Sequence, residues 1–157
     1  MTVLARNIKV IKTSDININD EFFNPLKREK HYLWANINNK KDNYGSFEEL
    51  WNMQSYVYVV YDNKDIKAMM GLYIPAEKKV KTKIGISIIK ASKLYYDYYD
   101  YFINSAITTA QIQGCFAVEL VVADSNKYLI KKIKSKYDCE LYHYTDDGFT
   151  KITIYAD

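Results

Sequence analysis

The clearest pattern of apolar and polar residues lies between Val80 and Ala123. From Val80 to Ile88 apolar residues alternate with polar or small ones, which is typical of a strand with one buried face. From Leu94 to Gln113 no proline or glycine occurs and apolar residues recur three or four apart, which predicts a helix ended by Gly114. The run from Phe116 to Ala123 is short and rich in β-branched residues, as in a buried parallel strand. These segments predict a right-handed strand–helix–strand unit.

Residues 7–53 predict one strand and two helices. Weak alternation from Asn7 to Thr13 indicates a first strand. An asparagine and a proline at 24–25 suit a helix start, and apolar residues continue the pattern to a predicted end near Asn36. Ser46 and Glu49 have the spacing of a capping box, which predicts a short helix through Met53.

Two further β-rich runs, Tyr56 to Tyr61 and Ile66 to Ile74, flank a polar turn of hairpin length. With the strand from Val80 to Lys90 they predict an antiparallel meander of three strands. After Ala123, a cap region at 124–126 and a stripe of apolar residues predict a helix that ends near Lys136.

The chain then ends in two predicted paired strands. They run from Leu141 to Tyr144 and from Thr150 to Tyr155, and the turn between them ends in an Asp-Gly pair at 147–148. We find no internal repeat and no linker, so residues 1–157 are expected to form one domain.

Composition narrows the class of protein. The chain has 157 residues, 48% of them hydrophobic and 26% charged, which is ordinary for a soluble globular domain. A net charge of +3 does not indicate a nucleic-acid partner. The sequence has neither a signal-peptide pattern at its start nor eighteen consecutive apolar residues, so we expect no membrane span.

The cysteines and histidines give little sign of chemistry. Cys115 and Cys139 lack any metal-binding spacing and are expected to be reduced thiols, which favours a cytoplasmic protein. His31 and His143 have no carboxylate or cysteine at ligand spacing, so core or surface roles are favoured over metal binding.

The order of elements resembles the GCN5-related N-acetyltransferase (GNAT) superfamily over nearly the whole chain. Gly71 stands where family members often carry a glycine on the third strand, and Ala110 with Gly114 is similar to the end of the coenzyme-cradling helix. Asn126 resembles an asparagine that often contacts the pantetheine arm of the cofactor. The resemblance implies an α/β fold: a mixed sheet flanked by helices, with the parallel fourth and fifth strands splayed apart into a cleft.

The resemblance also implies acetyl-coenzyme A as the cofactor. Family members usually carry Arg/Gln-x-x-Gly-x-Gly/Ala before the long helix, because glycine lets backbone amides approach the pyrophosphate. The aligned segment here runs from Lys93 to Tyr98, and Tyr96 and Tyr98 replace both glycines. The positions expected to hold the cofactor are Ile88, Ile89, Lys93, Tyr95, Tyr96, Asp97, Tyr98 and Asn126.

Four residues are candidates for the chemistry. Glu119 lies within a predicted strand and would act as a general base if it faced the cleft, whereas the simpler alternative is a carboxylate on a half-exposed strand face. Ser87 would hydrogen-bond the acceptor or a water molecule, or else faces solvent. In many family members a tyrosine on the last helix protonates the leaving thiolate, and the equivalent residue here looks like Ile133. Tyr128 and Tyr137 lie nearby and are either substitutes for that tyrosine or packing residues.

Two surfaces admit a binding role. The helix start is rich in tyrosine, and Tyr96 and Tyr99 are expected outside the core stripe, where they would contact a second copy of the chain or a protein partner. Ordinary packing explains these tyrosines equally well. Lysines between 127 and 136 would attract a phosphate of coenzyme A or an acidic partner, although a solvated helix face is the usual meaning.

Two functions therefore follow from the sequence. The first is an acyltransferase that moves an acetyl group from acetyl-coenzyme A to an amine of unknown identity, with the amine attacking the thioester directly. The alternative is a GNAT-like protein that has lost catalysis and serves as a binding or regulatory module. The departure at Tyr96 and Tyr98 is the feature that separates them.

Overall fold

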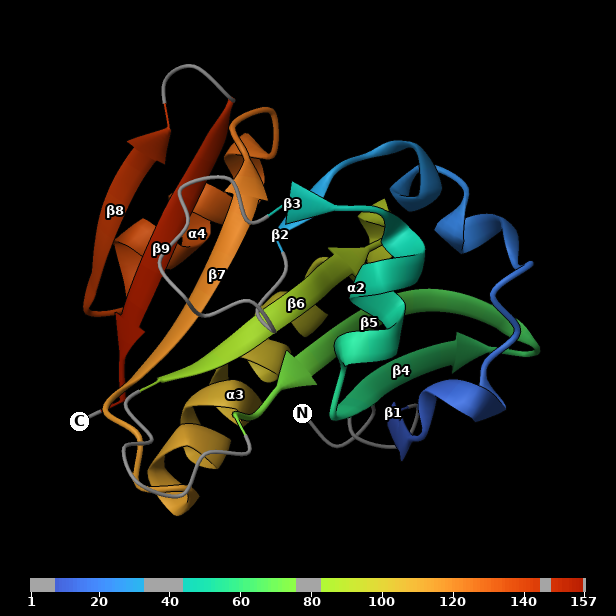
Figure 1. Ribbon diagram of the computed structural model, residues 1–157, viewed down its shortest axis with the longest axis horizontal. Coiled ribbons are helices and arrows are strands. Elements are labelled where there is room, and N and C mark those ends of the chain that lie inside the picture. Colours follow the sequence, from blue (N-terminus) through green and yellow to red (C-terminus); the bar gives the residue numbers. More distant parts are fainter. Residues whose placement is uncertain (1–7, 33–43, 76–82, 145–147, 157) are drawn as a thin grey trace. The chain divides into compact units, whose positions relative to one another are not determined.

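The computed structural model describes residues 8–32, 44–75, 83–144 and 148–156 (Figure 1). Seven strands form a mixed sheet in the order β1-β4-β5-β6-β7-β9-β8, and β2 pairs with β3 separately. The strands are β1 (Ile8–Ile11), β2 (His31–Tyr32), β3 (Tyr44–Gly45), β4 (Tyr56–Asp62), β5 (Asp65–Tyr73), β6 (Lys83–Ala91), β7 (Ala117–Ala123), β8 (Cys139–Tyr144) and β9 (Phe149–Tyr155). The helices are α2 (Phe47–Met53), α3 (Tyr98–Ile112) and α4 (Lys127–Lys136), with 3-10 turns η1 (Thr13–Asp15), η2 (Glu21–Phe23), η3 (Leu26–Arg28) and η4 (Lys93–Tyr95).

The chain divides into two compact units. Unit 1 contains Met1–Tyr73 and Ser87–Phe102, and unit 2 contains Ile74–Ile86 and Ile103–Asp157. Both β6 and α3 therefore begin in one unit and end in the other. The single domain expected from the sequence over residues 1–157 stays a prediction.

In unit 1, α2 and an aromatic cluster pack on the β4–β5 hairpin (Figure 1). The predicted capping box starts α2, because Ser46 Oγ accepts from the Glu49 amide at 3.2 Å and Glu49 Oε1 accepts from the Ser46 amide at 3.3 Å. The ring of Trp51 lies edge-on to Phe23, with 5.3 Å between the ring centroids. The predicted strands at β1, β4 and β5 are confirmed, and they pair antiparallel.

The helix predicted from Asn24 to Asn36 is wrong within the described residues. The chain makes the turns η2 and η3 and then the strand β2. The Asp20 carboxylate accepts from the Phe22 amide at 2.9 Å, and the two short turns bury Phe22, Phe23 and Leu26 in the aromatic cluster. Burial of these three side chains by separate turns outweighs the local helix signal, and the predicted end near Asn36 lies outside the described residues.

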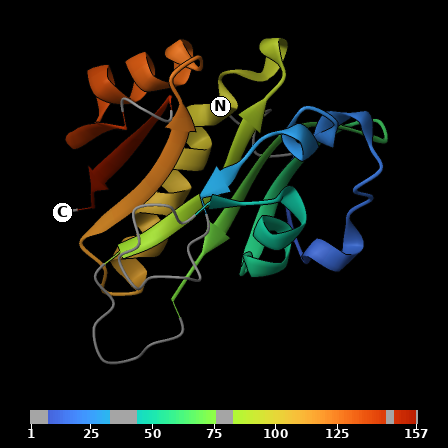
Figure 2. The ribbon, with the colours of Figure 1, turned by 45° about the horizontal axis from the view of Figure 1, so that its top comes forward.

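In unit 2, the first half of β6 runs parallel to β7, from Lys83 opposite Ala117 to Ile86 opposite Leu120. The predicted parallel pair is thus confirmed, although residues 80–82 lie outside the described part. Strand β9 pairs antiparallel with β8, as predicted, and it also pairs antiparallel with β7. Helix α4 covers one face of these strands (Figures 1 and 2), and its Leu129 and Ile133 are fully buried.

Helix α3 begins at Tyr98, four residues later than the predicted start at Leu94. The preceding turn is held by tertiary contacts: the Tyr99 hydroxyl accepts from the Ala91 amide at 3.1 Å, and the Tyr95 hydroxyl donates to Asp62 at 2.7 Å. Tyr99 is therefore buried, and its expected place outside the core stripe is wrong. The predicted C-terminal cap is confirmed, because Gly114 has a φ of +73°.

Candidate functional site

Glu119, the candidate general base, is almost completely buried on β7 of unit 2. Its side chain lies in register with Gly85 of β6 and Thr153 of β9, and the residue is 4% exposed. Glu119 Oε2 accepts a hydrogen bond from Lys83 Nζ at 2.8 Å. The sequence-based alternative, a half-exposed carboxylate, does not describe this environment. A buried carboxylate held by one ammonium group has the chemistry of a positioned proton acceptor or of a structural ion pair.

Asn126 and Tyr128, also in unit 2, lie at the start of α4. The Asn126 side chain accepts from the Leu129 amide at 3.4 Å and so caps the helix. Tyr128 is 44% exposed, with the Lys132 ammonium 5.5 Å from its ring centroid. Ile133 is fully buried and carries no group that could donate a proton. Of these positions, Tyr128 presents a proton donor at the surface.

Unit 2 also contains a polar chain that the sequence analysis missed. His143 Nδ1 lies 2.8 Å from Thr150 Oγ1, and the Thr150 hydroxyl donates to Asp124 Oδ1. Because the single hydroxyl proton goes to Asp124, Thr150 Oγ1 accepts in its contact with His143 Nδ1. The strand register puts His143 opposite Thr150, and no spacing along the sequence signals it.

In unit 1, Ser87 is already hydrogen-bonded within the protein. Its Oγ lies 3.2 Å from Gln54 Oε1 and 3.2 Å from the carbonyl oxygen of Gly71. A Cβ atom on Gly71 would lie 1.3 Å from Gln54 Oε1, so the carboxamide occupies the space that a side chain at 71 would fill. Ser87 thus has a protein partner, Gln54, that the sequence analysis did not identify. Its predicted bond to the acceptor substrate or to water stays a prediction.

Strand β6 is irregular next to Ser87. Ser87 contacts Gln54 at the end of α2, and the following residue, Ile88, packs in the same aromatic cluster as α2. Adjacent residues of a regular strand point to opposite faces. In addition, β6 advances five residues from Ser87 to Ser92, whereas β5 advances four from Gly71 to Lys67, whose carbonyl accepts from the Ser92 amide. Both observations indicate an extra residue in β6, a β-bulge.

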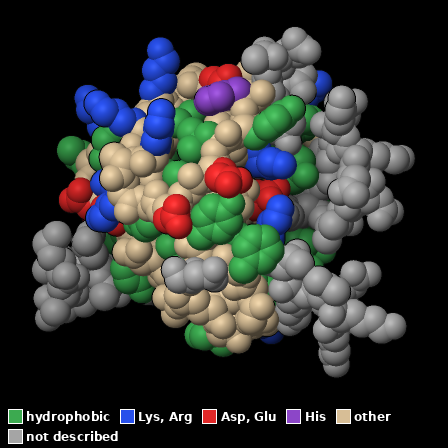
Figure 3. Space-filling model, turned by 90° about the vertical axis from the view of Figure 1, so that its left-hand side faces the viewer, with side chains coloured by type: hydrophobic (Ala, Val, Ile, Leu, Met, Phe, Trp, Pro, Cys, Tyr) green, Lys and Arg blue, Asp and Glu red, His purple; other side chains and the backbone are tan. Residues whose placement is uncertain are grey.

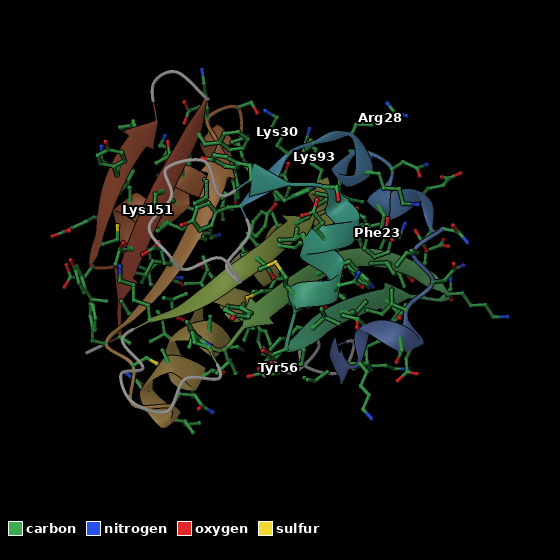
Figure 4. The ribbon with its side chains drawn as sticks, in the orientation of Figure 1. Phe23, Arg28, Lys30, Tyr56, Lys93 and Lys151 are labelled. Atoms are coloured by element: carbon green, nitrogen blue, oxygen red, sulfur yellow. The ribbon has the colours of Figure 1, made fainter. Side chains whose placement is uncertain are left out.

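The segment aligned with the pyrophosphate motif follows β6 in unit 1 (Figure 4 labels Lys93). Lys93 and Asp97 are exposed, and Leu94 is 93% exposed. Tyr98, at the second glycine position, is 3% exposed and packs against Phe102, with 6.2 Å between ring centroids. Its side chain therefore points into the protein core and not toward a ligand at the helix start.

The other tyrosines of this segment are also packed. The rings of Tyr96 and Tyr99 lie 5.5 Å apart, and Tyr96 is partly buried. The hydrogen bond from Tyr95 to the Asp62 carboxylate raises the pKa of the Tyr95 phenol. These contacts hold the turn in one conformation without either glycine.

Lys90 links the end of β6 to η2. Its ammonium donates to the Phe22 carbonyl at 3.1 Å and lies 4.9 Å from the Phe22 ring centroid. Burial lowers the pKa of Lys90, and the Glu29 carboxylate opposes this effect. Lys90 is thus a packed residue of unit 1, which leaves Lys93 as the exposed basic group of this segment.

The surface of unit 2 carries mixed charges. In the view of Figure 3, basic, acidic and hydrophobic side chains are interspersed. Lys127, Lys131, Lys134 and Lys136 of α4 are exposed, as expected of a solvated helix face. Among the described residues, no three His, Cys, Asp or Glu side chains form a metal site, and no helix is long and apolar enough to cross a membrane.

Comparison with known proteins gives a result for structure alone. No protein-family model and no curated protein matches the sequence. The structure is similar to an IAA acetyltransferase from Bacillus cereus, with a TM-score of 0.61 and 12% identity over 94% of this chain and 97% of that chain. It is also similar to the Campylobacter jejuni N-acetyltransferase PseH solved with acetyl coenzyme A, with a TM-score of 0.56 and 13% identity over 96% and 99% of the two chains. The chain has the GNAT fold.

A third similar structure shows how widely this fold is used. The AHL synthase LasI matches with a TM-score of 0.57 and 5% identity, over 96% of this chain and 89% of that one. The GNAT fold confirms the mixed sheet with flanking helices that the sequence predicts. The roles of Glu119, Tyr128, Ser87 and the cofactor positions stay predictions.

Proposed function

We propose that the protein is an acyl-coenzyme A-dependent N-acetyltransferase that transfers an acetyl group to an amine. The observation that carries this proposal is the GNAT fold over nearly the whole chain, which the structure shares with acetyltransferases. The β-bulge of β6 adds support, because a bulge leaves backbone groups outside the regular ladder, where a ligand can bond them.

Acetyl-coenzyme A is the proposed cofactor, and its thioester would supply the activated acetyl group. The residues present fit it in one respect: the side chain of Tyr98 is buried against Phe102, so it does not take up the space of a ligand at the helix start. We assign the thioester end to the backbone of Ile88 and Ile89, and the pantetheine arm to Asn126. The phosphates are assigned to the segment Lys93, Tyr95, Tyr96, Asp97 and Tyr98, where the ammonium of Lys93 offsets the carboxylate of Asp97.

Glu119 is the proposed proton acceptor for the attacking amine. Its carboxylate is buried and held by Lys83, so it is positioned before any substrate binds. Tyr128 is the proposed proton donor to the leaving thiolate, because its hydroxyl lies on an exposed side chain. Ser87 orients the strand beside the thioester through its hydrogen bonds to Gln54 and Gly71.

The proposed compartment is a reducing cytoplasm. Both cysteines are thiols, of which Cys115 is buried and Cys139 is partly buried. Burial raises the pKa of the Cys139 thiol, which keeps it protonated and unreactive at neutral pH.

Titration calorimetry with acetyl-coenzyme A tests the function directly. Saturable binding in the micromolar range, with loss of affinity in Lys93→Ala, is the expected result. Lys64→Ala, on the exposed β4–β5 turn, is the matched control and should bind as the wild type does. No heat of binding at millimolar cofactor would reject the acetyltransferase and favour the alternative, a binding or regulatory module.

A further inference from the structure

The carboxamide of Gln54 is the most unusual polar group of unit 1. Gln54 follows α2 as its C-terminal cap and lies at the entry to β4. Its Nε2 atom is buried and, among the described residues, has no hydrogen-bond partner. A buried amide donor without a partner is costly in free energy, so its place requires an explanation.

Gly71 on β5 leaves the space that the Gln54 carboxamide occupies. Gly71 has no positive φ, so backbone conformation does not require glycine there. The glycine is required by packing, because a Cβ atom would lie 1.3 Å from Gln54 Oε1 and 2.5 Å from its Cδ. Any larger residue at 71 would expel the carboxamide from the sheet surface.

The carboxamide of Gln54 is hydrogen-bonded to Ser87, the residue next to the bulge. Ser87 Oγ lies 3.2 Å from both Gln54 Oε1 and the Gly71 carbonyl, yet one hydroxyl carries one proton. Ser87 Oγ therefore donates to one of these two oxygens at a time. When it donates to Gln54 Oε1, the bond ties α2 to β6 at the bulge between Ser87 and Ile88.

We propose that Gln54 is a positioning residue, which acts through Ser87 to fix the bulge of β6 in the conformation that binds the acyl-coenzyme A thioester. This inference rests on the proposed function for its ligand. Its structural part, that Gln54 holds the bulge, stands on the contacts of unit 1 alone. Gln54 itself would not touch the reacting atoms.

The test compares four variants by calorimetry with acetyl-coenzyme A, thermal unfolding and amide hydrogen exchange at Ser87, Ile88 and Ile89. Gln54→Met removes the hydrogen bond at similar length, and Gly71→Ala expels the carboxamide from the other side. Gln54→Glu keeps an oxygen that accepts from Ser87. Asn52→Leu, an exposed carboxamide on the same helix, is the matched control.

The expected result is a loss of cofactor affinity of about fivefold in Gln54→Met and Gly71→Ala, the factor that one average hydrogen bond is worth. Exchange at the three amides should become faster in both. Gln54→Glu should stay within about threefold of the wild type, since it retains the bond to Ser87. Asn52→Leu should change neither affinity nor exchange.

Two results would overturn the inference. One is wild-type affinity and exchange in Gln54→Met, and the other is equal loss in Gln54→Glu and Gln54→Met, which would mark a shape requirement only. If Gly71→Ala does not fold, the two Gln54 variants decide. If the wild-type protein does not bind acetyl-coenzyme A, the proposed function fails, and exchange in Gln54→Met then decides alone whether Gln54 holds the bulge.

Discussion

Glu119 and Lys83 show how one residue pair admits two roles. The carboxylate is buried and the side chain of Lys83 is 35% exposed, so the pair lies between the interior and solvent. A structural ion pair needs both charges, whereas a proton acceptor needs the carboxylate in its negative form. Replacement of each partner separately distinguishes these roles.

Glu119→Gln should lower turnover by roughly 10² and leave acetyl-coenzyme A affinity nearly unchanged, because a general base acts in the transition state. Steady-state kinetics with a panel of amines, together with calorimetry, measures both quantities. Lys83→Met is the paired control and should destabilise the protein by about 1–2 kcal/mol, reduced from a fully buried pair by its exposure. Equal losses of binding and turnover in Glu119→Gln would assign Glu119 a structural role.

The tyrosines at the glycine positions differ in burial, so their replacements should differ too. Tyr98→Gly should cost about 3–5 kcal/mol through lost packing, since the ring is buried against Phe102. Tyr96→Gly should cost about 1 kcal/mol or less and should raise cofactor affinity, because the partly buried ring no longer crowds the amides. Thermal unfolding and calorimetry on the two single variants give these values.

Tyr96→Gly also tests the tyrosine surface. A drop in self-association, with no gain in cofactor affinity, would support an interaction surface for a second copy of the chain. If neither self-association nor cofactor affinity changes, Tyr96 is an ordinary packing residue.

At the scale of elements, the C-terminal end of α3 is fixed by Gly114. Its φ of +73° is left-handed, and a Cβ atom there would meet nothing within 4 Å, so any cost of substitution is due to the backbone. The Cys115 amide closes the cap by donating to the Ala110 carbonyl at 2.8 Å.

Gly114→Ala should therefore destabilise the protein by about 1–2 kcal/mol, and Gly114→Asn should cost less because asparagine tolerates this conformation better. Chemical denaturation of the three proteins measures the difference. Gly71→Ala offers a contrast, because its cost is steric. An alanine at 114 that leaves the free energy of unfolding unchanged would contradict this account of the cap.

Elements with local signals were predictable from the sequence. The capping box of α2, the alternation in β4 and β5 and the caps of α3 and α4 depend on residues close together in the chain. The start of α3 was not predictable in this way, because the preceding turn is held by Asp62 and Ala91. Likewise, the turns η2 and η3 follow the burial of aromatic side chains against α2.

The residues of the candidate site also differ in whether the sequence signals them. Glu119 could be found because a charged residue interrupts an apolar strand, whereas its burial is known only from the structure. Gln54 and His143 could not, because their partners, Ser87 and Thr150, come close only through sheet register and packing. No pattern along the chain encodes such pairs.

At the scale of the whole molecule, two units share one chain. Strand β6 and helix α3 each begin in one unit and end in the other, so each unit contains parts of the same two elements. Shared elements favour cooperative unfolding, because neither unit retains its full set of strands and helices once the other has unfolded.

The distribution of tryptophan makes this cooperativity measurable. Both tryptophans, at 34 and 51, lie in the sequence of unit 1, so indole fluorescence reports unit 1, whereas far-ultraviolet circular dichroism reports the helices and strands of both units. We expect the two optical signals to change together during urea denaturation, with one midpoint and one slope. Separate midpoints would contradict a single domain over 1–157. Because tryptophan occurs only in the sequence of unit 1, the protein carries an intrinsic fluorescent probe of one of its two units.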